Sequence, residues 1–431
     1  MFAGKRPGAA VEREIIQANV DEKSETRPNL FENLVCNCFL LFGKNWRETV
    51  DPIERGRDGK TGNLHNVLVR DRYRERFAAK LPNEHFRQSQ HLWLSSIGLG
   101  TYLGNYDDAT DQQYHQAVVK AVGAGCNVID SAINYRLQRS ERSIGTALKE
   151  LAGQGFNRDE VVVATKGGFI PYDGTPPKEP RQYIENTLIK TGLAGAADIV
   201  SGCHCMTPNY LLNQIDCSLR NLDVETIDIY YLHNPETQLG KVTAGEFDSR
   251  LVKAFEALEG AAGAGKIQMY GMATWNCFRN AADAKDYLSL AHVVELAEKA
   301  GGKNHRFKVI QLPFNLGMSE ALTHANQPAH GHHHNVLEVA QDLGLTVMCS
   351  ASILQGQLSH DLPPIIAETF AGLESDAQRA LQFVRSTPGV ATALVGMKRQ
   401  KHVEENLAAA RVAPAPWEQY SKLFQAQSSL E

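Results

Sequence analysis

The feature that most constrains the fold of this chain is an alternation of short apolar segments with amphipathic ones. Eight apolar segments, rich in Val and Ile, lie at residues 95–104, 127–132, 161–168, 227–234, 266–273, 307–315, 345–352 and 391–397. The segments that follow them place apolar residues three and four positions apart, and several end in glycine, which is typical of helices. Unbroken alternation of this kind predicts parallel strands joined by right-handed crossovers.

Eight strand–helix units predict an α/β protein with the (β/α)8 TIM-barrel fold. A doubly wound open sheet is the competing fold, and it would more often carry a GxGxxG turn after its first strand. The only candidate for that turn, GLGTYLG at 98–104, has different glycine spacing. We therefore expect a barrel at 95–412, an N-terminal extension at 1–94 and a C-terminal tail at 413–431.

The extension at 1–94 has mixed charge and no clear period before ERFAAK at 75–80. We expect it to be partly irregular with some helix, either packed on the barrel or forming a partly disordered arm. Self-association through it stays open. The first residues lack the apolar region of a secretory signal, and no apolar run approaches the roughly 20 residues that span a bilayer. The sequence thus favours a cytoplasmic protein without a membrane partner.

Charge and cysteine usage exclude two further classes of function. The net charge is −5, which gives no sign of a nucleic-acid partner. The closest cysteine pairs, Cys36/Cys38 and Cys203/Cys205, have no matching second pair of ligands, and a zinc site needs four. The histidine-rich run at 330–335 is expected to be an exposed insertion after the sixth strand. No metal site is predicted.

Titratable side chains follow consecutive predicted strands. Asp130 ends the second strand, Tyr135 lies in the loop after it, and Lys166 and His233 end the third and fourth. Because a barrel carries its active site at the carboxyl ends of its strands, we expect these side chains to meet on one rim. Any one of these side chains alone would more often lie in a solvated loop or hydrogen-bond within the core. Together they indicate a catalytic site.

Several motifs resemble the aldo/keto reductase family, barrel oxidoreductases that use a nicotinamide cofactor. The resemblance rests on GLGTYLG, IDSAINY, SERSIG, ATKGG, DIYYLHNP and LVGMKRQKHVEENLAAA, which follow the family's order over about residues 93–412. It implies that Asp130, Tyr135, Lys166 and His233 are the catalytic residues. It also implies a small-molecule carbonyl substrate, an aldehyde or a ketone.

The chemistry of carbonyl reduction fits these residue types. A hydride must reach the carbon, which the cofactor supplies, and a proton must reach the oxygen. A nearby ammonium favours the phenolate, so Lys166 would make Tyr135 a better general acid. Asp130 would neutralise and orient the lysine. His233 would hydrogen-bond the substrate carbonyl.

The resemblance also implies a cofactor site. Lys398 and Arg399 precede a predicted helix, a favourable place for a phosphate, and they favour NADP (NADPH) over NAD; a solvated basic turn is the alternative. The other implied cofactor residues are Gly100, Thr101, Tyr102, Asp130, Thr274, Gln311, Ser350, Gly396, Glu405 and Asn406. Tyr102, Phe169 and Trp275 are the expected substrate-binding residues, and packing at the rim is the alternative for Phe169 and Trp275.

The chain departs from the family pattern at several cofactor positions. Ala273 and Thr274 stand where many members have Ser and Asn, and Ser350 stands where many have a tyrosine that stacks on the nicotinamide. His402 occupies a position that is often basic. These departures weaken the expected cofactor contacts, whereas the four expected catalytic residues do not depart.

The sequence is therefore consistent with three functions. The leading one is an NADPH-dependent reductase of aldehydes or ketones. The second is an NAD-dependent sugar or alcohol dehydrogenase. The third is a cofactor-binding regulatory or redox-sensing subunit of a larger assembly, which the long extension and the altered cofactor contacts keep open.

Overall fold

Eight parallel strands close into a barrel at the centre of residues 64–424, the part of the chain that the computed structural model describes. In chain order the barrel strands are β3 (Ile97–Gly100), β4 (Val128–Asp130), β5 (Val162–Gly167), β6 (Ile227–His233), β7 (Ile267–Ala273), β8 (Phe307–Pro313), β11 (Thr346–Ser350) and β12 (Val390–Gly396). Each pairs with the next along the chain, and β12 pairs with β3. The predicted (β/α)8 fold is confirmed.

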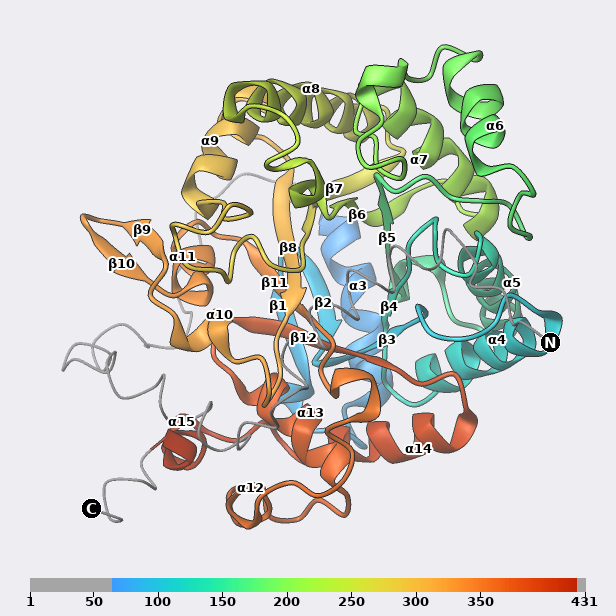
Figure 1. The fold of residues 1–431 in the computed structure, drawn as a ribbon. Coiled ribbons are helices and arrows are strands. Elements are labelled where there is room, and N and C mark those ends of the chain that lie inside the picture. Colours follow the sequence, from blue (N-terminus) through green and yellow to red (C-terminus); the bar gives the residue numbers. More distant parts are fainter. Residues whose placement is uncertain (1–63, 425–431) are drawn as a thin grey trace, which may run out of the picture.

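Helices surround the strands, as Figure 1 shows. The main ones are α4 (Asp108–Val122), α5 (Arg139–Gly153), α7 (Pro208–Leu222), α8 (Ala244–Gly263), α9 (Leu290–Gly301), α11 (Val336–Asp342), α13 (Asp376–Ser386) and α14 (Gln400–Ala408). Local sequence sets where several begin. The Asp107 carboxylate accepts a hydrogen bond from the Thr110 backbone N–H at 2.8 Å and starts α4, and Ser375 forms a capping box at the start of α13.

A hairpin closes the amino-terminal end of the barrel. Its strands are β1 (Phe86–Ser89) and β2 (Leu92–Ser95), which pair antiparallel. Leu92 and Leu94 are buried in the same apolar cluster as Val128 and Val162, the first residues of β4 and β5. The Asn127 side chain joins the two parts, since its Oδ1 accepts from the Ser95 backbone N–H at 2.8 Å.

Further segments outside the barrel pack against it. Helix α3 (Leu64–Phe77) contacts the end of α4, where the Tyr73 hydroxyl donates to the Val122 carbonyl at 2.6 Å. Beyond residue 412, α15 (Trp417–Tyr420) buries Tyr420, whose hydroxyl lies 2.7 Å from the Thr387 hydroxyl. Parts of the segments expected as extension and tail therefore belong to the packed structure. Cys36 and Cys38 lie outside the described residues.

Insertions interrupt the regular alternation after three strands. The longest follows β5 and contains α6 (Pro180–Ile184); α12 (Pro364–Thr369) follows β11. After β8 come α10 (Glu320–Thr323) and a hairpin of β9 (Gln327–Ala329) and β10 (His332–His334), which carries the histidine run. The run is exposed in part, as expected of an insertion, and Asn335 caps α11 directly after it.

Within residues 64–424, no group of three or more His, Cys, Asp or Glu side chains is arranged to hold a metal ion. Among the helices of that same range, none has the length and apolar character needed to cross a membrane.

The register of the barrel places the expected site residues side by side. Gly100 is paired with Asp130 on one side and with Gly396 on the other. Ala273 is paired with both His233 and Gln311. The carboxyl ends of the strands thus form a continuous rim on which the site is built.

Candidate active site

The centre of the site is a buried ion pair between neighbouring strands. Lys166 has no exposed surface, and its Nζ donates to Asp130 Oδ1 at 2.6 Å and to the Ser131 carbonyl at 2.7 Å. The second carboxylate oxygen of Asp130 accepts from Gln311 Nε2 at 2.7 Å. Both charges are therefore satisfied, as buried charges must be if they are not to destabilise the fold.

Tyr135 and His233 lie beside this pair. Lys166 Nζ is 4.9 Å from the centre of the Tyr135 ring. The Tyr135 ring meets the His233 ring edge-on with centroids 5.8 Å apart, and it meets the Tyr102 ring at 5.0 Å. The structure thus brings together all four residues expected to be catalytic, and a cation lies next to the phenol that would transfer a proton.

Electrostatics keep His233 neutral. Burial and the Lys166 ammonium lower the pKa of His233 well below its usual value. Its Nδ1 has no hydrogen-bond partner among the described residues. A neutral imidazole can hydrogen-bond a polar group of a ligand through a ring nitrogen that faces the ligand.

A cavity of about 590 Å³ opens beside these residues. This volume lies within the usual range of small-molecule sites. Of the expected site residues, Gly100, Thr101, Tyr102, Asp130, Tyr135, His233, Thr274, Trp275, Gln311, Ser350, Gly396, Lys398, Arg399, Glu405 and Asn406 line it, as do Ala273 and His402. The residues at the barrel rim and those of the β12–α14 turn therefore face one space.

Two expected residues do not line this cavity. Lys166 lies behind Asp130 and Tyr135. Phe169, expected to bind substrate, is buried and meets the His233 ring edge-on with centroids 5.1 Å apart. It supports the histidine from the side rather than forming a wall of the cavity.

The sequence did not predict some of the residues that line the cavity. Tyr114 and Asn234 belong to the wall, together with the turn 351–359 after β11. In that turn Ala351 and Gln355 adopt positive φ angles of 55° and 53°. Non-glycine residues with positive φ are uncommon and often occur in ligand-binding turns. Alanine and glutamine as residue types do not indicate this conformation, so the sequence could not predict the turn.

The strand end at Ala273 is held by a half-buried glutamate side chain. Glu236 Oε1 accepts from the Trp275 backbone N–H at 2.5 Å, and burial raises the pKa of Glu236 to about 7. This contact fixes the turn that carries Thr274 and Trp275 into the cavity wall.

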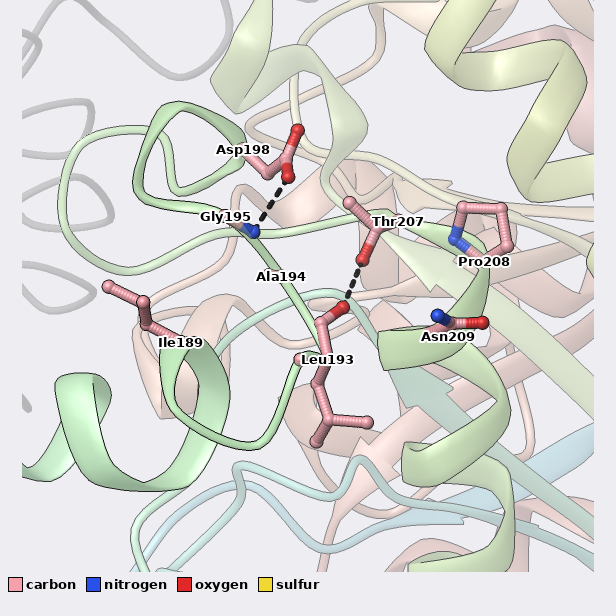
Figure 2. Close-up of a pocket in the computed structure, with 9 residues that line it drawn as sticks. Ile189, Leu193, Ala194, Gly195, Asp198, Thr207, Pro208 and Asn209 are labelled. Carbon is pink, nitrogen blue, oxygen red and sulfur yellow. Dashed lines mark hydrogen bonds between the residues drawn. The ribbon is translucent and has the colours of Figure 1, made fainter.

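A second cavity, of about 460 Å³, lies in the insertion after β5. Figure 2 shows its wall, in which the Thr207 hydroxyl donates to the Leu193 carbonyl and the Gly195 backbone N–H donates to Asp198. None of the expected site residues lines it. Its place is on the insertion, not at the rim of the barrel.

The fold and the rim together define a (β/α)8-barrel protein with a titratable site at the carboxyl ends of its strands, where barrel enzymes carry their active sites. The family model for the aldo/keto reductase family matches residues 96–427. The chain belongs to the aldo/keto reductase family of oxidoreductases.

Individual relatives are distant. The chain is 22% identical over 337 residues to a probable voltage-gated potassium channel subunit beta of Arabidopsis thaliana, covering 75% of this chain and 89% of that protein. It is 30% identical over 162 residues to probable aldo-keto reductase 1 of Glycine max, covering 37% of this chain and 38% of that protein.

A solved structure shares the fold. It is an aldo/keto reductase of Klebsiella pneumoniae in complex with NADP and acetate, with a TM-score of 0.53 and 22% identity, covering 80% of this chain and 95% of that one.

Proposed function

We propose that this protein is an NADPH-dependent reductase of aldehydes or ketones and that Tyr135 is its general acid. The observation that carries the proposal is the position of the Lys166 ammonium, 4.9 Å from the centre of the Tyr135 ring and fixed there by Asp130. A buried cation beside a phenol favours loss of the phenolic proton, which is what a proton donor to a carbonyl oxygen requires.

The cavity residues fit a nicotinamide dinucleotide. Lys398 and Arg399 supply positive charge at the start of α14, which suits a phosphate group, and Gly100 and Gly396 expose backbone without side chains at the rim. When bound, NADPH supplies the hydride, which no side chain of this chain can provide.

The remaining steps belong to the protein's own side chains. Neutral His233 holds the carbonyl oxygen of the substrate by a hydrogen bond and so orients it. Tyr135 gives its phenolic proton to that oxygen, and Lys166 stabilises the phenolate that remains. Asp130 keeps the ammonium in place, because both of its oxygens are already bonded, to Lys166 and to Gln311.

The test is NADPH oxidation with a panel of aldehydes and ketones, for the native chain and for Tyr135→Phe. The variant keeps the ring but loses the proton, so we expect its kcat to fall by about a hundredfold or more. Tyr73→Phe is the matched control, since it removes a buried hydroxyl at the amino-terminal end of the barrel. Equal rates for native chain and Tyr135→Phe would contradict the proposal.

A second candidate is a cofactor-binding subunit of a larger assembly. It is favoured by the alignment with the Arabidopsis thaliana channel subunit along 89% of that protein's length. This candidate predicts tight NADPH binding, very slow turnover on the whole panel and a stable protein partner. An NAD-dependent sugar or alcohol dehydrogenase would instead oxidise alcohols faster with NAD than with NADP under matched conditions.

A further inference from the structure

We propose that His204 is a positioning residue, which fixes the main chain of His233 and thereby the imidazole that faces the cavity. The proposal rests on the function proposed above. His204 comes from the insertion after β5, and His233 is the last residue of β6. The two meet where His204 Nε2 lies 2.8 Å from the His233 carbonyl oxygen.

A chain of hydrogen bonds determines which nitrogen of His204 carries the proton. A guanidinium can only donate, so Gln238 must turn its Oε1 towards Arg250 Nη1, at 3.1 Å. Gln238 Nε2 then points at His204 Nδ1, at 3.1 Å, and Nδ1 must accept. The proton is therefore on Nε2, which donates to the His233 carbonyl.

His204 keeps this arrangement over the usual assay range. It is fully buried, and burial lowers the pKa of His204 to about 4. A neutral ring keeps Nδ1 free to accept from Gln238 and adds no second charge beside His233.

The close approach of the two histidines requires glycine at position 168. Gly168 has a φ of +133°, and a Cβ built there would lie 2.8 Å from His204 Nε2 and 3.1 Å from the His233 carbonyl oxygen. Any side chain would thus enter the contact. This gives a physical reason for Gly168, the second glycine of the sequence KGG at 166–168.

Phe169 completes the support. Its ring meets the His204 ring edge-on with centroids 5.3 Å apart and the His233 ring at 5.1 Å. The next residue, Asn234, has a φ of 43°, and its backbone N–H donates to the Ala273 carbonyl at 2.7 Å. The His233 carbonyl therefore lies at a sharp turn, where a missing partner would let the chain shift.

The backbone that carries His204 is itself held on both sides. The Cys205 N–H donates to the Gly168 carbonyl at 2.9 Å, and the Ile170 N–H donates to the Cys203 carbonyl at 2.7 Å. Cys205 is buried in a small separate core with Leu188, Ala194 and Tyr210. Figure 2 shows the neighbouring anchor, where Thr207 bonds to Leu193 at 2.9 Å.

The test compares His204→Leu with His204→Gln, which keeps an N–H donor. The readout is the rate of hydride transfer in a single turnover, per NADPH-binding site, because loss of folded protein changes the number of sites but not this rate. We expect His204→Leu to slow transfer about tenfold to a hundredfold with unchanged NADPH affinity, and His204→Gln to recover part of the loss.

His85→Leu is the matched control. His85 is also a buried histidine on a backbone carbonyl, 2.9 Å from that of Gly125, but it lies at the amino-terminal end of the barrel. We expect its rate per site to equal that of the native chain. If His204→Leu behaves like His85→Leu, the proposal is overturned. Should His204→Leu not fold, Gln238→Leu replaces it, and an unchanged rate per site would overturn the proposal equally.

A further readout separates this proposal from the proposed function. If the native chain reduces no carbonyl, the function fails, and histidine ring signals in nuclear magnetic resonance spectra decide the role of His204. We then expect His204→Leu to shift or broaden the His233 ring signals and His85→Leu to leave them in place. Unchanged His233 signals in His204→Leu would overturn the positioning role by itself.

Discussion

At the scale of single residues, the site depends on satisfying charges that water cannot reach. Lys166 is fully buried, yet it contacts the Asp130 carboxylate and the Ser131 carbonyl. The buried Tyr231 ring lies 5.9 Å away, and burial and Asp130 raise the pKa of Tyr231 well above its usual value. That second phenol therefore keeps its proton, which leaves Tyr135 as the phenol that we propose as the general acid.

The buried pair leads to a stability prediction. Lys166→Met removes the cation and leaves the Asp130 carboxylate uncompensated, so we expect a loss of about 3–5 kcal/mol in the free energy of unfolding. The double variant Asp130→Leu/Lys166→Met removes both charges and should regain a large part of it. Urea denaturation of the three proteins measures this, and a double variant less stable than the single one would contradict it.

At the scale of elements, the two ends of the barrel have separate tasks. The turn between β12 and α14 brings Lys398 and Arg399 into the wall of the cavity. The hairpin of β1 and β2 fills the opposite end with Leu92 and Leu94. Changes at one end should thus alter ligand binding, and changes at the other should alter stability.

The β12–α14 turn allows a test of cofactor choice. Lys398→Met removes a positive charge from the cavity wall, and a hydrogen bond to a charged group contributes about 1.5–3 kcal/mol. We expect NADPH affinity to fall at least about tenfold while NADH affinity stays nearly constant. Fluorescence titration measures both. Lys401→Met is the control, because Lys401 is exposed at the start of α14 and does not line the cavity.

The contribution of the β1–β2 hairpin to the stability of the barrel can be tested. Leu94 is 1% exposed among the apolar residues inside the barrel, so Leu94→Ala should destabilise the protein by about 2–5 kcal/mol. Leu103→Ala, at a side chain that is 39% exposed, should change stability little. Chemical denaturation distinguishes them, and equal effects would show that the hairpin does not stabilise the barrel.

At the scale of the whole molecule, buried histidines link stability to pH. His85, His204 and His233 are all buried, and burial lowers the pKa of each below its usual value. A histidine whose pKa is lowered by folding takes up a proton more readily when the chain unfolds. Each of them therefore makes the folded state less stable as pH falls below about 6.5.

His85 gives the clearest measurement, since it lies far from the cavity and the pKa of His85 is lowered to about 3. In His85→Gln this linkage is absent. Between pH 7 and pH 5 we expect the unfolding free energy of the native chain to fall by about 2 kcal/mol relative to the variant. Parallel denaturation curves at both pH values measure the difference, and a constant difference would show that folding does not lower the pKa of His85.

The sequence by itself determined the barrel and the meeting of four side chains on its rim. Strand–helix periodicity is local, and parallel strands must bring Asp130, Lys166 and His233 to the same edge, so both follow without tertiary contacts. The cavity-facing positions of Lys398 and Arg399 follow from the same topology.

Only the tertiary structure decided what supports that rim. His204 and His233 are 29 residues apart, and their contact depends on how the insertion after β5 folds back over Gly168. The same packing turns Phe169 towards the histidines instead of the cavity. Loops have no periodicity that encodes where they return, so their contacts appear only when the whole chain is packed.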